Sequence, residues 1–350
     1  MAGPAHELLK RVIVILALSL ALGFGGLYLA AGGALFRVDT YRVQDPSFPI
    51  FLVFLTALIG QWSVPAFKIQ LLCMSQGISM PYRPALYTHL VAVFGAAITP
   101  NNTGGVPTTV AALGRLGVPL GKGIGVIVQI FVLDLIFFSW TTPLGIGYLI
   151  YSRTIHLPVS ANILAFAAVV LAIAAAVILT RYPRVIVRLI LTMAKWPLFR
   201  RFDSGMLKAA RDYYRSANAY LNMPASTWLV LHLVTAIGWI SGFVILWALL
   251  HLYGIGASLL TTLALLSSIT LISNFIPTPG GSGFIEAAVS LSVGAGAGSI
   301  AAAVLVWRLT SFYLIFLLGP PAGWLLYLSP PVVFPKGSET TPKREPEKRL

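Results

Sequence analysis

The chain has 350 residues, of which 57% are hydrophobic and only 10% are charged, and its formal net charge is +14. Soluble domains carry about 25% charged residues, so the composition excludes a water-soluble fold of this length. The basic residues cluster in loops between apolar segments, as in membrane proteins that contact lipid headgroups, and nothing resembles a nucleic-acid module. With a single cysteine, Cys73, and no metal-ligand spacing, the sequence predicts neither a disulfide nor a metal site, and we expect no cofactor.

Six segments are long and apolar enough to cross ~30 Å of hydrocarbon as helices. They are 12–32, 48–67, 122–150, 159–180, 227–253 and 299–328. The first segment is long for the core of a signal peptide, and no small-residue cleavage site is evident, so we expect it to be retained. The sequence therefore predicts an all-α polytopic membrane protein, with one transmembrane domain at 1–330 and a disordered cytoplasmic tail at 331–350.

Two further apolar regions, 85–117 and 259–298, are interrupted in the middle. The first break, 99–107, reads TPNNTGGVP, and the second break, 277–283, reads PTPGGSG. Proline lacks a backbone N–H and glycine allows positive φ, so neither run continues a helix. Each flanking arm has about 15–18 residues, or about 22–27 Å, which is short for a full crossing. We predict two re-entrant helical hairpins; the alternatives are one long kinked helix or two separate spans at each place.

Loop charges support this topology if both termini are cytoplasmic and each broken region begins and ends on one side. Lys68 then falls in a cytoplasmic loop, and the cytoplasmic loop 181–226 carries nine basic residues. Helical spacing within that loop predicts an amphipathic helix at the inner membrane surface, or a solvated connecting helix. The chain then contains two repeats, repeat 1 at about 12–150 and repeat 2 at about 159–328. Each repeat consists of two spans, a hairpin and a third span, and the two repeats have opposite orientations in the membrane. Such inverted repeats are typical of transporters. We expect the cytoplasmic membrane of a prokaryote.

The second break is the most specific motif in the chain. The segment 275–287, FIPTPGGSGFIEA, closely matches a P-x-P-G-G-x-G-x-x-E pattern. It resembles the signature of the lysylphosphatidylglycerol synthetase membrane-region family, also called flippase-like integral membrane proteins. The resemblance covers about residues 8–328 and includes the first break, LGRLGVP at 113–119, and Arg308 followed by Tyr313. It implies a protein that moves lipids or lipid-linked molecules, without the soluble aminoacyl-transferase domain of the lysylphosphatidylglycerol enzymes.

The sequence departs from the family pattern at two places. Members often carry a Glu just after the Gly-Gly of the first break, where this chain has Val106. Many also carry an acid–base pair shortly before the aspartate equivalent to Asp134, where Ile130 and Phe131 stand here. If those groups contact substrate or protons, this protein differs from such members in substrate or coupling.

A new helix is expected after each break, near the membrane centre. Its unpaired N–H groups and positive dipole end attract an anion, so two such ends facing each other would hold a phosphate headgroup. The alternative is that the break residues only cap and turn the hairpins. The predicted substrate-binding residues are Asn101, Asn102, Thr103, Gly104, Gly105, Pro277, Pro279, Gly280, Gly281, Ser282, Gly283, Glu286 and Arg308.

Three charged residues lie deep in the predicted membrane segments: Asp134, Glu286 and Arg308. Ionisable groups at this depth are costly unless they are paired, and they are functional by default. Arg308 has two candidate partners, Glu286 in a static salt bridge or a lipid phosphate held by the planar guanidinium. Asp134 and Glu286 are the candidates for proton or ion coupling.

These features predict a lipid translocase that moves a phosphate-bearing lipid or lipid-linked molecule between leaflets. The expected partners are membrane lipids with an anionic or zwitterionic phosphate headgroup, and no nucleic acid; the sequence makes no prediction of oligomeric state. The alternatives are a membrane-embedded enzyme acting on phospholipid or polyprenyl-phosphate substrates, and a small-anion channel. Against an enzyme, the sequence contains no nucleophile–base pair, no aspartate-rich metal motif and no Gly-rich nucleotide loop.

Overall fold

The computed structural model describes residues 4–32, 41–152, 182–194, 203–274, 276–293 and 297–332, with a few single residues between 170 and 178. Most of the predicted span 159–180 and the predicted tail from residue 333 onward lie outside these ranges. The α-helices are α1 (Pro4–Ala31), α2 (Phe48–Ser75), α3 (Tyr82–Ala97), α4 (Gly105–Arg115), α5 (Leu120–Tyr151), α7 (Pro183–Ala194), α8 (Asp203–Leu221), α9 (Ala225–Leu252), α10 (Leu259–Ser273), α11 (Phe284–Val293), α12 (Ala297–Arg308) and α13 (Ile315–Leu328).

Four helices of the described residues are long and apolar enough to cross a membrane. They are Phe48–Ser75, Leu120–Tyr151, Ala225–Leu252 and Gly298–Leu328, where α12, a π-helical turn at Leu309–Tyr313 and α13 run on from one another. Ile13–Leu29 and Leu259–Ser273 are shorter apolar helices. The polytopic α-helical class predicted from the sequence is thereby confirmed.

One predicted boundary is wrong. Helix α2 continues to Ser75 instead of ending at residue 67, so Lys68 lies inside a membrane helix and not in a cytoplasmic loop. Its side chain is buried and forms an ion pair with Asp134 of α5. Since a charge inside the membrane is tolerated when it is paired, Lys68 does not end the apolar segment.

Both broken regions are interrupted at the positions that were predicted from their proline and glycine residues. A short 3-10 turn occupies Pro100–Asn102 in the first break and another occupies Pro279–Gly281 in the second. Asn101 has φ 51° and Gly280 has φ 59°, so the backbone enters the left-handed region at each turn and the helix cannot continue. The two turns contact each other, α3 packs against α4, and α10 packs against α11.

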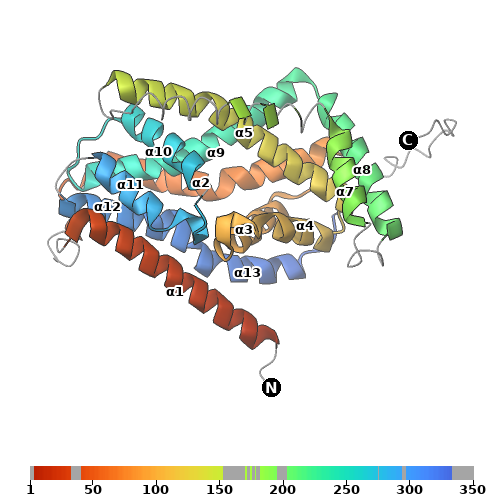
Figure 1. Ribbon diagram of the computed structural model, residues 1–350, viewed down its shortest axis with the longest axis horizontal. Helices are drawn as coiled ribbons and strands as arrows, with labels where there is room; N and C mark the ends of the chain where they lie inside the picture. Colours follow the sequence, from red (N-terminus) through yellow and green to blue (C-terminus); the bar gives the residue numbers. More distant parts are fainter. Residues whose placement is uncertain are drawn as a thin grey trace.

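Hydrogen bonds at opposite ends of the molecule connect segments that are distant in the sequence. At one end, the backbone N–H groups of Gln44 and Asp45 donate to Leu252 O, and the Gln44 side chain donates to Ser299 Oγ. At the other end, Val332 N donates to Leu116 O just after α4. Figure 1 shows α10 and α11 towards the left, α3 and α4 to their right, and α7 and α8 at the right-hand end.

Helix α8 has the two faces that the sequence predicted. The face that includes Tyr213 and Tyr220 is buried against α5 and α7, whereas Lys208, Arg211 and Arg215 are exposed. Its apolar face is therefore covered by the protein itself, and its basic face is left open.

Candidate functional site

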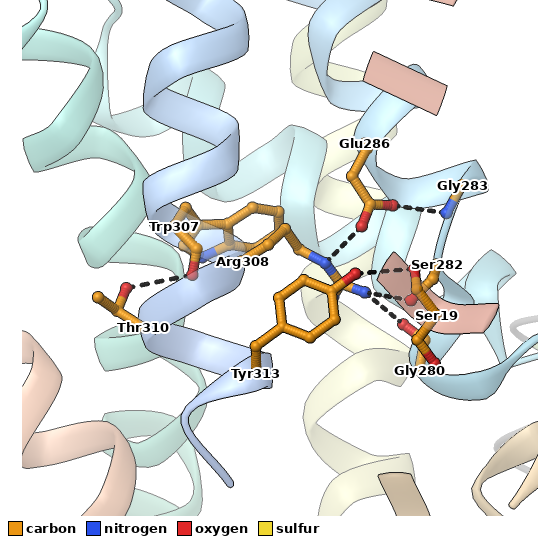
Figure 2. A network of polar contacts seen from close by, with 9 residues as sticks. All are labelled: Ser19, Gly280, Ser282, Gly283, Glu286, Trp307, Arg308, Thr310 and Tyr313. Carbon is orange, nitrogen blue, oxygen red and sulfur yellow. Dashed lines mark hydrogen bonds and ion pairs between the residues drawn. The ribbon is translucent and has the colours of Figure 1, made fainter. Parts of the chain in front are cut away.

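Arg308 is the centre of a buried polar network at the end of α12. Its Nε donates to Glu286 Oε1 at 2.8 Å, and its Nη2 donates to Gly280 O at 3.0 Å and to Ser282 Oγ at 3.1 Å. The Arg308 and Glu286 side chains are only 6% and 1% exposed. Figure 2 shows the guanidinium pointing into the second break, so one side chain ties α12 to both the turn and α11.

Glu286 also determines what the N-terminus of α11 can bind. Its Oε2 accepts a hydrogen bond from Gly283 N at 2.8 Å, in the manner of a capping-box glutamate (Figure 2). The carboxylate thus occupies the positive end of α11, where an external anion was expected from the sequence. An incoming phosphate would have to displace Glu286 or contact Arg308 from another side.

Close packing explains why glycine occupies two positions of the second break. A Cβ on Gly280 would lie 2.1 Å from the Phe312 ring, and one on Gly281 would lie 2.8 Å from Ile285. The Phe312 ring also stacks under the Arg308 guanidinium, 4.5 Å from its centroid to Cζ. Close packing and positive φ therefore account for these two glycines without a ligand.

Helix α1 covers this network from outside. The Tyr313 hydroxyl, in the π-helical turn, donates to Ser19 O at 2.9 Å (Figure 2). A Cβ on Gly23 would lie 2.7 Å from the Tyr313 hydroxyl, and a Cβ on Gly26 would lie 2.3 Å from Gly283 O. Small residues on one face of α1 thus allow it to approach the second break at backbone distance.

The first break lies against the second but presents its polar side chains differently. Asn101, Asn102 and Thr103 are exposed. Thr99, which was not among the predicted binding residues, accepts a hydrogen bond from Gly104 N at 2.7 Å through Oγ1. A Cβ on Gly104 would lie 2.3 Å from Gly95 O, so this glycine allows α3 and α4 to pack closely.

A cavity of about 410 Å³ lies beside the breaks, between α2, α3, α5, α9, α10, α11 and α12. Asp134 lines it and accepts two hydrogen bonds on Oδ1, from Lys68 Nζ at 2.8 Å and from Trp239 Nε1 at 2.9 Å. His89 and Arg308 line the same cavity. Arg308 therefore joins the break network to the cavity, and Asp134 lies in the cavity and not in the network.

Lys68, His89 and Trp239 line the cavity but were not among the substrate-binding residues predicted from the sequence. A signal for Lys68 was present, because it is the only charged residue in the 28 residues of α2. The break residues, by contrast, do not line the cavity. Within the described ranges, no group of three or more His, Cys, Asp or Glu side chains could hold a metal ion.

A family model described as the lysylphosphatidylglycerol synthase TM region matches residues 8–319. The chain belongs to this family. The matched region contains α1 from residue 8 onward, both breaks, the residues that line the cavity and the Arg308 network.

This member of the lysylphosphatidylglycerol synthase TM-region family is also similar to a curated relative that is described as a membrane protein. A UPF0104 membrane protein of Archaeoglobus fulgidus is 22% identical over 278 residues, which cover 77% of this chain and 84% of the relative. Together with the apolar helices, family membership shows that the protein is an integral membrane protein.

Proposed function

We propose that this protein is a lipid translocase that moves a phosphate-bearing lipid, or a lipid-linked molecule, between the two leaflets. The observation that supports it most is the cavity inside the helix bundle, which is lined by Arg308 and by the Lys68–Asp134 ion pair. The family name links this membrane region to a phospholipid product, which agrees with a lipid substrate.

The size and chemistry of the cavity suit a lipid headgroup. Small-molecule sites measure roughly 300–1,000 Å³, and this cavity measures about 410 Å³. Charged side chains inside a membrane are costly, and those that face a cavity mark a substrate path. A headgroup could lie among these polar groups while its tails stay in the lipid, which lowers the barrier to crossing the hydrocarbon.

We further infer that each broken pair, α3–α4 and α10–α11, is a re-entrant hairpin and that the two halves form an inverted repeat. Two observations support the inference. The two breaks contact each other, as inverted repeats with midplane breaks require. One hydrophobic cluster contains residues on both sides of the α3–α4 pair, including Met80 and Leu116. A separate cluster contains Ile255 and Ile300, which lie on both sides of the α10–α11 pair.

Single-cysteine labelling tests this topology. In a Cys73→Ser background, cysteines at Arg83 and Leu120 should react only with a reagent applied from the cytoplasmic side. Cysteines at Gly256 and Gly298 should react only from outside, because each hairpin returns to the side from which it entered. The measurement is labelling of intact cells with a membrane-impermeant maleimide, before and after lysis. Opposite sides for either pair would contradict the hairpins and the repeat.

Transport itself is tested in proteoliposomes that contain a fluorescent phospholipid. If the protein moves lipid, a membrane-impermeant reductant should quench inner-leaflet probe that stays protected in protein-free vesicles. Chloride conductance without lipid movement would favour the channel, and a changed lipid on mass spectrometry would favour the enzyme. Either result with well-folded protein would replace the translocase proposal.

A further inference from the structure

We propose that the cavity selects a phospholipid headgroup that carries both a phosphate and one primary ammonium group, with Arg308 facing the phosphate and Asp134 facing the ammonium. This inference rests on the proposed function, because it names the headgroup class that the cavity would accept. It follows from the charge balance of the cavity and from the hydrogen-bonding positions that its ion pairs leave open.

Among the described residues, the Lys, Arg, Asp and Glu side chains in and beside the cavity have charges that sum to zero. Lys68 and Arg308 are each paired with one carboxylate, Asp134 and Glu286 respectively, at 2.8 Å in both cases. An uncompensated charge in a low-dielectric site is strongly unfavourable. A zwitterionic headgroup leaves the sum at zero, whereas an anionic headgroup without an amine adds one unbalanced negative charge.

Each pair leaves one hydrogen-bonding position without a partner among the described residues. Lys68 and Trp239 both donate to Oδ1 of Asp134, and within the described residues Oδ2 of Asp134 accepts no hydrogen bond. Arg308 donates through Nε and Nη2, and its Nη1 donates to none of the described side chains or carbonyls. Asp134 of α5 and Arg308 of α12 both line the cavity, so we assign these two positions to the ligand.

This arrangement distinguishes a primary ammonium from a quaternary one. A primary ammonium donates up to three hydrogen bonds and can bind Oδ2 of Asp134 directly. A choline group has no N–H and cannot form this bond. The Asp134 side chain is 22% exposed while Lys68 is 8% exposed, so the carboxylate is the more accessible member of the pair.

Binding of short-chain phospholipids to the purified protein in detergent tests the proposal. Trp62, Trp239 and Trp307 line the cavity, so their fluorescence reports occupancy. We expect phosphatidylethanolamine to bind about tenfold more tightly than phosphatidylcholine, since a hydrogen bond to a charged group provides at least that factor. It should also bind more tightly than phosphatidylglycerol, whose negative charge is left unbalanced in the cavity. Equal affinity for phosphatidylethanolamine and phosphatidylglycerol in the unmodified protein would overturn the proposal.

Three variants separate charge from hydrogen bonding. Asp134→Asn makes the cavity positive and should shift the preference to phosphatidylglycerol. Lys68→Met combined with Asp134→Asn restores neutrality without the carboxylate, so the preference over phosphatidylcholine should disappear while thermal stability is largely kept. Asp45→Asn, which changes an exposed carboxylate outside the cavity, should bind like the unmodified protein. A preference for phosphatidylethanolamine over phosphatidylcholine that survives in a stable double variant would overturn the proposal.

The vesicle assay distinguishes this inference from the proposed function. Movement of all three lipids at one rate would contradict headgroup selection and leave the translocase intact. Selective binding of phosphatidylethanolamine without any movement would contradict the translocase and support the headgroup assignment.

Discussion

Replacing Arg308 with Met should lower the free energy of unfolding by about 3–5 kcal/mol, because the change leaves the buried Glu286 carboxylate without its cation. The guanidinium also donates to Gly280 O and Ser282 Oγ, and both acceptors would lose this partner. Glu286 is only 1% exposed, so water cannot replace the lost interactions without opening the network. Thermal unfolding in a fixed detergent would measure the loss.

The double variant Arg308→Met, Glu286→Gln separates structure from transport. The glutamine oxygen can still accept the hydrogen bond from Gly283 N, so the start of α11 should remain capped and stability should largely return. If Arg308 also contacts the lipid phosphate, lipid movement in vesicles should stay absent. Full movement by a stable double variant would show that Arg308 is only structural.

Arg308→Lys is the matched control for charge. Lysine keeps the positive charge but presents one ammonium in place of a planar group with separate Nε and Nη donors. It can pair with Glu286 but cannot reach Gly280 O and Ser282 Oγ in the same geometry. We expect stability between those of the unmodified protein and Arg308→Met.

Replacing Gly26 with Leu should destabilise the protein by about 1–3 kcal/mol, the cost of overpacking a close contact. A Cβ at this position would lie 2.3 Å from Gly283 O, a backbone atom of the second break that cannot move aside like a flexible side chain. Helix α1 would have to shift away, which would weaken the Tyr313–Ser19 hydrogen bond. Lipid movement should fall as well, because α1 encloses the Arg308 network.

The neighbouring Gly25 provides the control. No atom lies within 4 Å of a Cβ built there, and the residue is exposed on α1. Gly25→Leu should therefore leave unfolding temperature and lipid movement unchanged. Equal destabilisation of both variants would indicate a general effect of leucine in α1 and would contradict the specific contact with the second break.

Local chemistry allowed much of the fold to be predicted. The helices are interrupted at both breaks because proline lacks a backbone N–H and because neighbouring residues tolerate positive φ. These are properties of the residues themselves, so they can be predicted without knowledge of tertiary contacts. The Arg308–Glu286 pair was also accessible, because the two residues lie in consecutive segments. The end of α2 was predicted wrongly, since Lys68 was judged as a loop charge without knowledge of its partner.

By itself, the sequence determined the membrane class, most helix segments, the positions of the breaks and the three charged residues within apolar helices, because these depend on composition and on neighbours along the chain. Only the tertiary structure decided that Lys68 meets Asp134, 66 positions away, and that the Asn side chains of the first break stay outside the cavity. It also decided that α1 covers the second break and that Glu286 already occupies the end of α11. Such contacts depend on how distant helices pack, and packing is set by side-chain shape and pairing across the whole bundle, which no local pattern encodes.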